Sequence, residues 1–155
     1  NKEQSAMLKV INTCDEWVSQ IIKDDPVRPH LTADYRINKT AEMFGLYDDK
    51  EYLGSICCVR YTKGIPNSVS DMTDRSTDKN ADTAIFYTIW SYSKGSGRQL
   101  ILDASDWITS NKPEIKNLVT LSPVTEMAER FHLRNGATKW RINDDSVNYA
   151  YQLKA

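Results

Sequence analysis

Two glycines separated by one serine, Gly95 and Gly97, have the spacing in this chain that best suits chemistry. Glycine allows the backbone to approach a ligand closely, and a helix N-terminus carries unpaired N–H groups and roughly +0.5 charge. An apolar run precedes the pair and a helical pattern follows it, so the turn predicts a socket for phosphate. A tight turn without a ligand is the alternative that this stretch alone leaves open.

Two side chains in the last quarter of the chain could transfer protons. His132 follows Phe131 on a predicted helix, and a histidine with an ordinary pKa of about 6.5 can give or take a proton at neutral pH. Tyr149 lies on the last predicted strand and could point at the same cleft. A histidine on a helix surface and a tyrosine packed in the sheet are the structural alternatives.

Common catalytic and metal motifs are absent from the sequence, which has no Walker lysine, no HExxH and no nucleophile elbow. The glycine turn lacks the acidic residue of a dinucleotide site, so we expect a different phosphate or pyrophosphate ligand. Cys57 and Cys58 would point to opposite faces of a strand and could not share a metal. Asp48 and Asp49 fit a solvated turn, and we expect no metal site.

The 155 residues predict a single domain over 1–155, with a helical region over 1–40 and the sheet core and ligand site over 41–155. The net charge of −1, with scattered lysines and arginines, argues against nucleic acid or an anionic membrane as the partner. No apolar run reaches the ~18 residues of a membrane span. Three cysteines and no visible signal peptide favour the cytoplasm. The oligomeric state is not indicated.

Apolar residues at three- and four-residue steps predict an amphipathic helix over about Ser5–Lys23, ended by Asp24-Asp25-Pro26. Residues 27–40 are predicted to be a loop with one short helix. Two strands, Glu42–Tyr47 and Tyr52–Tyr61, follow as a hairpin. The long polar connection Thr62–Asp82 could close over the glycine turn, or it could be a disordered excursion.

The second half alternates strands and helices. A strand over Thr83–Trp90, a helix to about Ser110 and a strand over Asn117–Leu121 predict a parallel pair with a right-handed crossover. Ser122 is predicted to cap the next helix, with Pro123 at its first position. That helix is expected to end at Asn135-Gly136. A final hairpin is predicted from Ala137–Ile142 and Val147–Leu153.

In this order the motifs resemble GNAT-type acyl-CoA transferases, and most specifically the catalytic half of the malonyl-CoA decarboxylases, which has that fold. The matching segments lie between Thr62 and Leu153 in family order. They are Thr62–Pro66, Ala81–Tyr87, Lys94-Gly95, Thr120–Pro123, Phe131–Ala137, Trp140–Asn143 and Asn148-Tyr149.

The resemblance implies an α/β (α+β) fold with a mixed, mostly antiparallel sheet, a central parallel strand pair and flanking helices. It implies a coenzyme A thioester, acetyl-CoA or malonyl-CoA, as substrate, with pantetheine between the strands that end at Trp90 and Leu121. His132 would match the family's catalytic histidine and Tyr149 a site tyrosine. The residues expected to bind the cofactor are Ile89, Trp90, Ser91, Lys94, Gly95, Ser96, Gly97 and Arg98.

The sequence departs from the decarboxylase pattern at three positions. The family's Ser-Ile-Ser is Thr88-Ile89-Trp90 here, so the Thr88 hydroxyl stands at its catalytic serine, and a family acidic residue falls near Cys58. We therefore expect acyl transfer from a CoA thioester to an unidentified acceptor. Decarboxylation of malonyl-CoA, and a non-catalytic protein of this fold acting through a partner, remain open.

Overall fold

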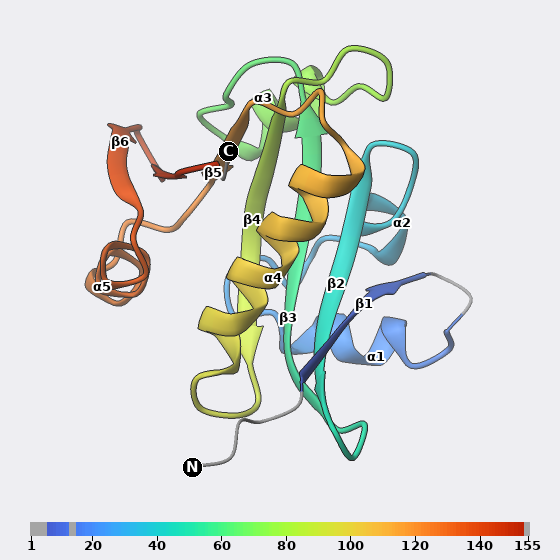
Figure 1. Cartoon of the computed structure of the whole chain (residues 1–155). Helices are drawn as coiled ribbons and strands as arrows, with labels where there is room; N and C mark the ends of the chain where they lie inside the picture. Colours follow the sequence, from blue (N-terminus) through green and yellow to red (C-terminus); the bar gives the residue numbers. More distant parts are fainter. Residues whose placement is uncertain (1–5, 13–14, 154–155) are drawn as a thin grey trace.

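One seven-stranded sheet organises the protein, in the order β1-β2-β3-β4-β5-β7-β6 (Figure 1). The computed structural model describes residues 6–12 and 15–153. Within them, β4 and β5 are parallel and the other neighbouring strands are antiparallel. The predicted mixed sheet with a central parallel pair is confirmed.

The strands are β1 (Ala6–Ile11), β2 (Ala41–Asp48), β3 (Leu53–Thr62), β4 (Thr83–Ser91), β5 (Asn117–Thr120), β6 (Thr138–Ile142) and β7 (Val147–Tyr151). The helices are α1 (Val18–Ile21), the 3₁₀ turn η1 (Ile22–Asp24), α2 (Ala33–Arg36), α3 (Val69–Arg75), α4 (Ser96–Asn111) and α5 (Glu126–Arg134). Both predicted hairpins and the strand–helix–strand unit from β4 to β5 are confirmed. No described helix has the length and apolar character that crossing a membrane requires.

Helices cover both faces of the sheet (Figure 1). The apolar side of α4, including Leu100 and Ile108, packs on one face, while Val18 of α1 and Met72 of α3 belong to the core on the other. Cys57 and Cys58 divide between these two cores, as the alternation of a strand requires. Both cysteines are therefore buried core residues.

A β-bulge interrupts β4 at its middle. Phe86 pairs with Val59 and Thr88 with Cys58, which leaves Tyr87 as the extra residue. Tyr87 packs in the core under α1 and α2, and Ile89 packs toward α4. A bulge bends its strand and breaks the pairing locally. β5 pairs with β4 only as far as Phe86, so from there to Ser91 β4 is paired with β3 alone.

The predicted helix over Ser5–Lys23 is wrong. Residues 6–11 form β1, which pairs with β2 along its whole length. Leu8 packs toward α4 and Ile11 toward the opposite face, which is strand alternation and not a helical stripe. Within the range of that prediction, the described helical residues belong to α1 and η1, and the region 1–40, which also contains α2, is not purely helical. Ser5 and Cys14 lie outside the described residues.

The connection 62–82 does not close over the glycine turn. It is ordered, carries α3, and lies at the opposite end of β4 from that turn (Figure 1). Ser68 accepts a hydrogen bond from the Asp71 N–H at 3.0 Å and caps α3. The lid and the disordered excursion are both wrong, because this segment packs on the C-terminal hairpin through the Ile65 and Pro66 carbonyls.

The start of α5 also differs from the prediction. Ser122 forms a β-bridge with Val147, with N–H···O distances of 2.9 Å in both directions, so it stays extended. The N-cap is Thr125, whose hydroxyl accepts from the Ala128 N–H at 3.2 Å. The predicted stop is confirmed, since Gly136 follows the C-cap Asn135 with φ +100°.

Candidate functional site

A cleft of about 990 Å³ opens where β4 and β5 separate. One wall is β4 from Phe86 to Ser91, and the facing wall is the segment Leu121–Pro123 together with α5. Pro26 and Val27, which follow η1 beneath the opposite face of the sheet, also line it. The cleft is therefore bordered by elements from both faces, which is the consequence of a gap between two strands.

The glycine turn lies at the end of this cleft. A side chain added at Gly97 would meet the Ser91 hydroxyl at 2.8 Å and the Phe131 ring at 3.5 Å, and both of these residues line the cleft. Gly95 is the N-cap of α4, with φ +84° and nothing within 4 Å of an added Cβ. Gly95, in the predicted phosphate socket, therefore has the left-handed backbone that favours glycine and open space beside it.

The donors of the turn are partly used within the protein. The Ser96 N–H donates to the Ser93 carbonyl at 3.2 Å, and its hydroxyl bonds the Ser55 hydroxyl at 2.6 Å. The first turn of α4 then leaves the N–H groups of Gly97 and Arg98 as the ones a ligand could meet, because the first N–H groups of a helix have no partner within it. Lys94 is exposed beside them.

Backbone groups of β4 face the cleft at alternate residues. The Tyr92 N–H donates to the Gly54 carbonyl at 2.6 Å, and hydrogen-bonded pairs alternate along an antiparallel ladder. We infer that Thr88 and Trp90 direct their backbone groups to β3, whereas Ile89 and Ser91 direct theirs into the cleft. Of the predicted range Ile89–Ser91, the two outer residues are thus the available donors.

His132 reaches the cleft from α5. It is 4% exposed, and burial lowers the pKa of its imidazole from 6.5 to about 4. The Nδ1 atom and the Tyr151 hydroxyl are 2.7 Å apart, so Nε2 is the ring nitrogen left for a substrate. A histidine with this pKa is neutral at pH 7, and it can accept a proton there more readily than donate one.

Tyr149 lies behind His132. Its ring stacks on the imidazole, with centroids 5.0 Å apart and planes at 26°, and it is 1% exposed. Among the described residues that line the cleft, His132 is included and Tyr149 is not. The structure therefore brings the two predicted residues together but places only the histidine at the cleft surface. Tyr151, which sequence reasoning missed, holds the imidazole from the side.

The Thr88 hydroxyl lines the cleft but is committed to a buried carboxylate. It donates to Asp25 at 2.7 Å, and Asp25 also accepts from the backbone of Val27 and Arg28 and from the Arg36 guanidinium. Burial alone would raise the pKa of Asp25, but these hydrogen bonds outweigh it and lower the pKa. Asp25 is thus a saturated anion, and its lowered pKa makes it a weak base for activating the Thr88 hydroxyl as a nucleophile.

Several cleft residues were missed by sequence reasoning. Arg130 and Arg134 line the cleft from α5, four residues apart and flanking His132, and they are the charged side chains of its lining. Arg98 donates to the Asn135 side chain at 2.8 Å and so ties the first turn of α4 to the end of α5. The i,i+4 spacing of the two arginines, which places them on one side of the helix, was the available signal.

Trp90, near the end of β4, is held in place by a chain of polar contacts. Its indole N–H donates to the Tyr92 hydroxyl at 2.8 Å, and that hydroxyl donates to Asp24 at 2.7 Å. This chain joins the end of β4 to η1. Trp90 therefore contributes its ring to the cleft wall and its N–H to the fold.

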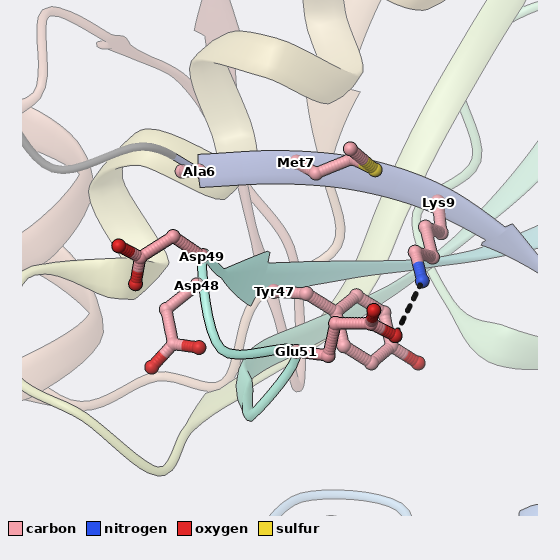
Figure 2. A pocket seen from close by; sticks show the side chains of 7 residues that line it. All are labelled: Ala6, Met7, Lys9, Tyr47, Asp48, Asp49 and Glu51. Atoms are coloured by element: carbon pink, nitrogen blue, oxygen red, sulfur yellow. Dashed lines mark ion pairs between the residues drawn. The ribbon is translucent and has the colours of Figure 1, made fainter.

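A second, smaller hollow of about 170 Å³ lies at the β1 edge of the sheet (Figure 2). Lys9 is paired with Glu51 there at 3.9 Å and lies over the Tyr47 ring. The Asp48 carboxylate accepts from the N–H groups of Lys50 and Tyr52, as a turn aspartate does. Among residues 6–12 and 15–153, no cluster of histidine, cysteine and acidic side chains could hold a metal.

Comparison with known proteins identifies relatives only through structure, since no family model and no curated protein matches the sequence. Malonyl-CoA decarboxylase from Rhodopseudomonas palustris superposes with a TM-score of 0.78 at 18% identity, over 96% of this chain and 60% of that one. The Agrobacterium vitis enzyme gives a TM-score of 0.66 at 23% identity, over 81% of this chain and 35% of that one. The chain thus spans about one third to three fifths of these decarboxylases.

A complete acetyltransferase is similar as well. The PaiA N-acetyltransferase from Thermoplasma acidophilum, solved in complex with coenzyme A, gives a TM-score of 0.65 at 12% identity, over 96% of this chain and 99% of that one. These likenesses agree with the sheet order, the parallel β4–β5 pair and the flanking helices. The chain has the GNAT fold.

Proposed function

We propose that this protein is an acyl-CoA-dependent acyltransferase whose two substrates meet in the cleft between β4 and β5. The observation that carries the proposal is the opening of this cleft toward elements on both faces of the sheet. The glycine turn and α5 border it on one side, and Pro26 and Val27 on the other. A CoA thioester and an acceptor could thus approach one carbonyl carbon from opposite sides.

The thioester would enter on the side of α4 and α5. Its pyrophosphate would sit on the N–H groups of Gly97 and Arg98, beside Gly95, with Lys94 adding positive charge. Its pantetheine would run along β4, where Ile89 and Ser91 offer backbone groups. A donor aimed at the developing oxyanion of a thioester is worth about 3 kcal/mol.

Transfer would proceed by attack of the acceptor amine on the thioester carbonyl. The amine nitrogen forms the new bond to the acyl carbon, the C–S bond breaks, and the thiolate leaves with that electron pair. The amine must lose a proton, and the neutral imidazole of His132 would accept or relay it through Nε2, a role supported by its position in the cleft lining and by the Nδ1 contact with Tyr151. Tyr149 would serve by holding the ring, not by touching the substrate.

Decarboxylation of malonyl-CoA is the second candidate, favoured by the TM-score of 0.78 to a malonyl-CoA decarboxylase. The same donors would stabilise the enolate left by loss of CO₂, and protonation of its carbon would give acetyl-CoA. The commitment of Thr88 to Asp25 weighs against this reaction, because the serine that the resemblance implies at this position is replaced by a hydroxyl already in use.

Coenzyme A binding is tested by the shift of thermal unfolding. Free CoA at ~100 times its Kd should add about 2.7 kcal/mol to the free energy of unfolding. The matched control is adenosine, which lacks the pyrophosphate and pantetheine and should give a far smaller shift. No shift at millimolar CoA would overturn both enzymatic readings and leave the non-catalytic one.

The reaction is tested by supplying acyl-CoA with and without an acceptor. Transfer predicts release of free CoA thiol from acetyl-CoA only when an amine acceptor is present. Decarboxylation predicts acetyl-CoA from malonyl-CoA with protein alone, detected by mass spectrometry. His132→Ala should abolish turnover and leave CoA affinity nearly unchanged, and unaltered turnover would remove His132 from the mechanism.

A further inference from the structure

We propose that Arg28 is a positioning residue that holds the β4 bulge in shape and so keeps the cleft open. Arg28 is 8% exposed, and its guanidinium donates to the backbone carbonyl of Tyr87, the extra residue of the bulge. The ligand-binding part of this inference rests on the proposed function, whereas the structural part does not.

The Tyr87 carbonyl needs a donor from outside the sheet. A bulged residue leaves the strand ladder, and β5 has ended at Thr120, so no neighbouring strand is aligned to satisfy this oxygen. A buried carbonyl without a partner is costly, which is why nearly all are paired. A guanidinium forms a charge-assisted bond, stronger than that of a neutral N–H group.

Arg28 is itself held by a rigid buried network. Its N–H donates to Asp25 at 2.9 Å, and its carbonyl accepts from Arg36 at 2.7 Å. The ion pair between Asp25 and Arg36, 2.8 Å long, has both side chains fully buried. Breaking such a network leaves charges unpaired in the core, so it fixes the geometry of its members.

The segment 25–28 bonds both residues at the bulge. Arg28 donates to the Tyr87 carbonyl, and Asp25 accepts from the Thr88 hydroxyl. Between these two anchors, Pro26 and Val27 line the cleft. The loop that would meet the acceptor and the strand that would hold the thioester are therefore joined through one pair of contacts, and the role of Thr88 is to be held in place.

Without the guanidinium, the bulge carbonyl would seek another donor, and the simplest is a ladder bond that draws β4 toward β5. Arg28→Met keeps most of the volume and removes the donor. We expect it to weaken CoA binding about tenfold, which corresponds to about 1.4 kcal/mol. Arg28→Lys can still donate to the carbonyl and should recover most of the affinity.

Arg60→Met is the matched control. Arg60 is 7% exposed and also donates from a buried guanidinium to a backbone carbonyl, that of Tyr35, and to the Ser76 hydroxyl, so its hydrogen bonds go to groups other than the Tyr87 carbonyl. Its loss should lower stability and leave CoA affinity within about twofold of the wild type. A general effect of removing a buried arginine would instead weaken binding in both variants.

The ligand-free protein provides a second readout by NMR. The carbonyl ¹³C shift of Tyr87 and the amide shift of Thr88 should move in Arg28→Met, return in Arg28→Lys and stay in Arg60→Met. If wild-type protein binds no CoA, the proposed function fails, and the NMR shifts still decide the role of Arg28. Unmoved shifts, or equal CoA affinity in the wild type and Arg28→Met, would overturn the inference. If Arg28→Met does not fold, Arg28→Gln takes its place, because its polar but shorter and neutral side chain does not replace the guanidinium bond to the Tyr87 carbonyl, and the same shifts and the same loss of affinity are expected.

Discussion

His132 combines a buried imidazole with a single polar partner on one ring nitrogen. The ring lies between Tyr149, which stacks on it, and Phe131 and Tyr151, which meet it edge-on. An aromatic cage of this kind holds a ring in place and excludes the water that would stabilise its charged form. The structure therefore favours a proton acceptor over a proton donor at neutral pH.

The lowered pKa of His132 predicts a stability that depends on pH. The unfolded chain takes up a proton near pH 6.5, but the folded protein resists it until about pH 4. The contribution of the neutral His132 to the free energy of unfolding is therefore fully present above pH 6.5. It is lost as the pH falls toward 4, by about 3 kcal/mol at most. Urea unfolding at several pH values should show this slope in the wild type and a flatter one in His132→Gln.

His30→Gln is the control for this prediction, since the chain has two histidines and His30 is exposed. It should keep the slope of the wild type. Asp25 also loses stabilising contacts in acid, but because its pKa is lowered in the folded protein, most of that loss falls at more acidic pH than the loss from His132. An equal slope in the wild type and His132→Gln would show that the imidazole is not shielded.

The sequence predicts which residue types could line a site, but it does not predict which side chains contact one another. His132, Ile89 and Ser91 do line one cleft. The commitment of Thr88 to Asp25 was hidden, because the two residues lie 63 positions apart and a carboxylate before a proline looks like a helix stop. Buried polar networks of this kind carry no periodic signal, so sequence reasoning has no means of pairing their members.

At the scale of elements, Asn148 explains why the segments behind the resemblance occur together. Its amide donates to the carbonyls of Pro66 at 3.1 Å and Thr120 at 2.8 Å. Its side-chain oxygen accepts from Arg141 at 3.0 Å and Asn143 at 2.9 Å. Four of the matching segments thus meet at one fully buried side chain, and their shared role here is to join β5, β6 and β7 to the loop before α3.

Asn148→Ala should destabilise the fold strongly. It leaves two buried carbonyls without a donor, and each such loss costs about 1–3 kcal/mol. We expect the free energy of unfolding to fall by about 3 kcal/mol or more, measured by chemical denaturation. Asn111→Ala is the control, because Asn111 is exposed and has one bond along its own helix. A loss for Asn148→Ala as small as that of Asn111→Ala would contradict this role.

The start of α4 makes a prediction of its own. Gly95 has φ +84° in open space, so a side chain there meets backbone strain but no clash. Gly95→Ala should therefore cost about 1–2 kcal/mol. Asparagine tolerates this conformation better than alanine, and Gly95→Asn should cost clearly less. Equal losses in the two variants, measured by urea unfolding, would point to a cause other than backbone strain.

The elements were predictable where pattern and pairing agree. The hairpins and the β4–α4–β5 unit have turn residues at their ends and a clear period, and the structure contains them. The strand β1 was read as a helix because Leu8 and Ile11 fit a helical step, yet pairing with β2 decides its conformation. A short apolar segment fits a helical step and a strand alternation equally well, so its neighbours decide its structure, and the sequence alone does not reveal them.

At the scale of the whole molecule, the cleft divides the sheet unequally. The ladder between β3 and β4 runs from Ser55 to Thr62, whereas the ladder that joins β5 to β4 runs only from Thr83 with Asn117 to Phe86 with Thr120. Contacts such as Arg98 with Asn135 connect α5 back to α4. The smaller part, β5–β7 with α5, is therefore held by short ladders and a few polar contacts.

This unequal division predicts two levels of hydrogen-exchange protection. Amides of β3 and β4 should open only near the free energy of global unfolding, whereas those of β6, β7 and α5 should exchange through a smaller opening. CoA, if it binds across the cleft, should raise the protection of α5 and of the Leu121 N–H, which bonds the Phe86 carbonyl at 3.0 Å.

The β2–β3 hairpin is the internal control, because bound CoA should raise the protection of its amides only by the global stabilisation. One uniform opening free energy, unchanged in its distribution by CoA, would mean that the cleft does not separate two cooperative parts. Two distinct opening free energies would instead identify the step that admits substrate as an opening between these two parts of the sheet, and not as the motion of a lid.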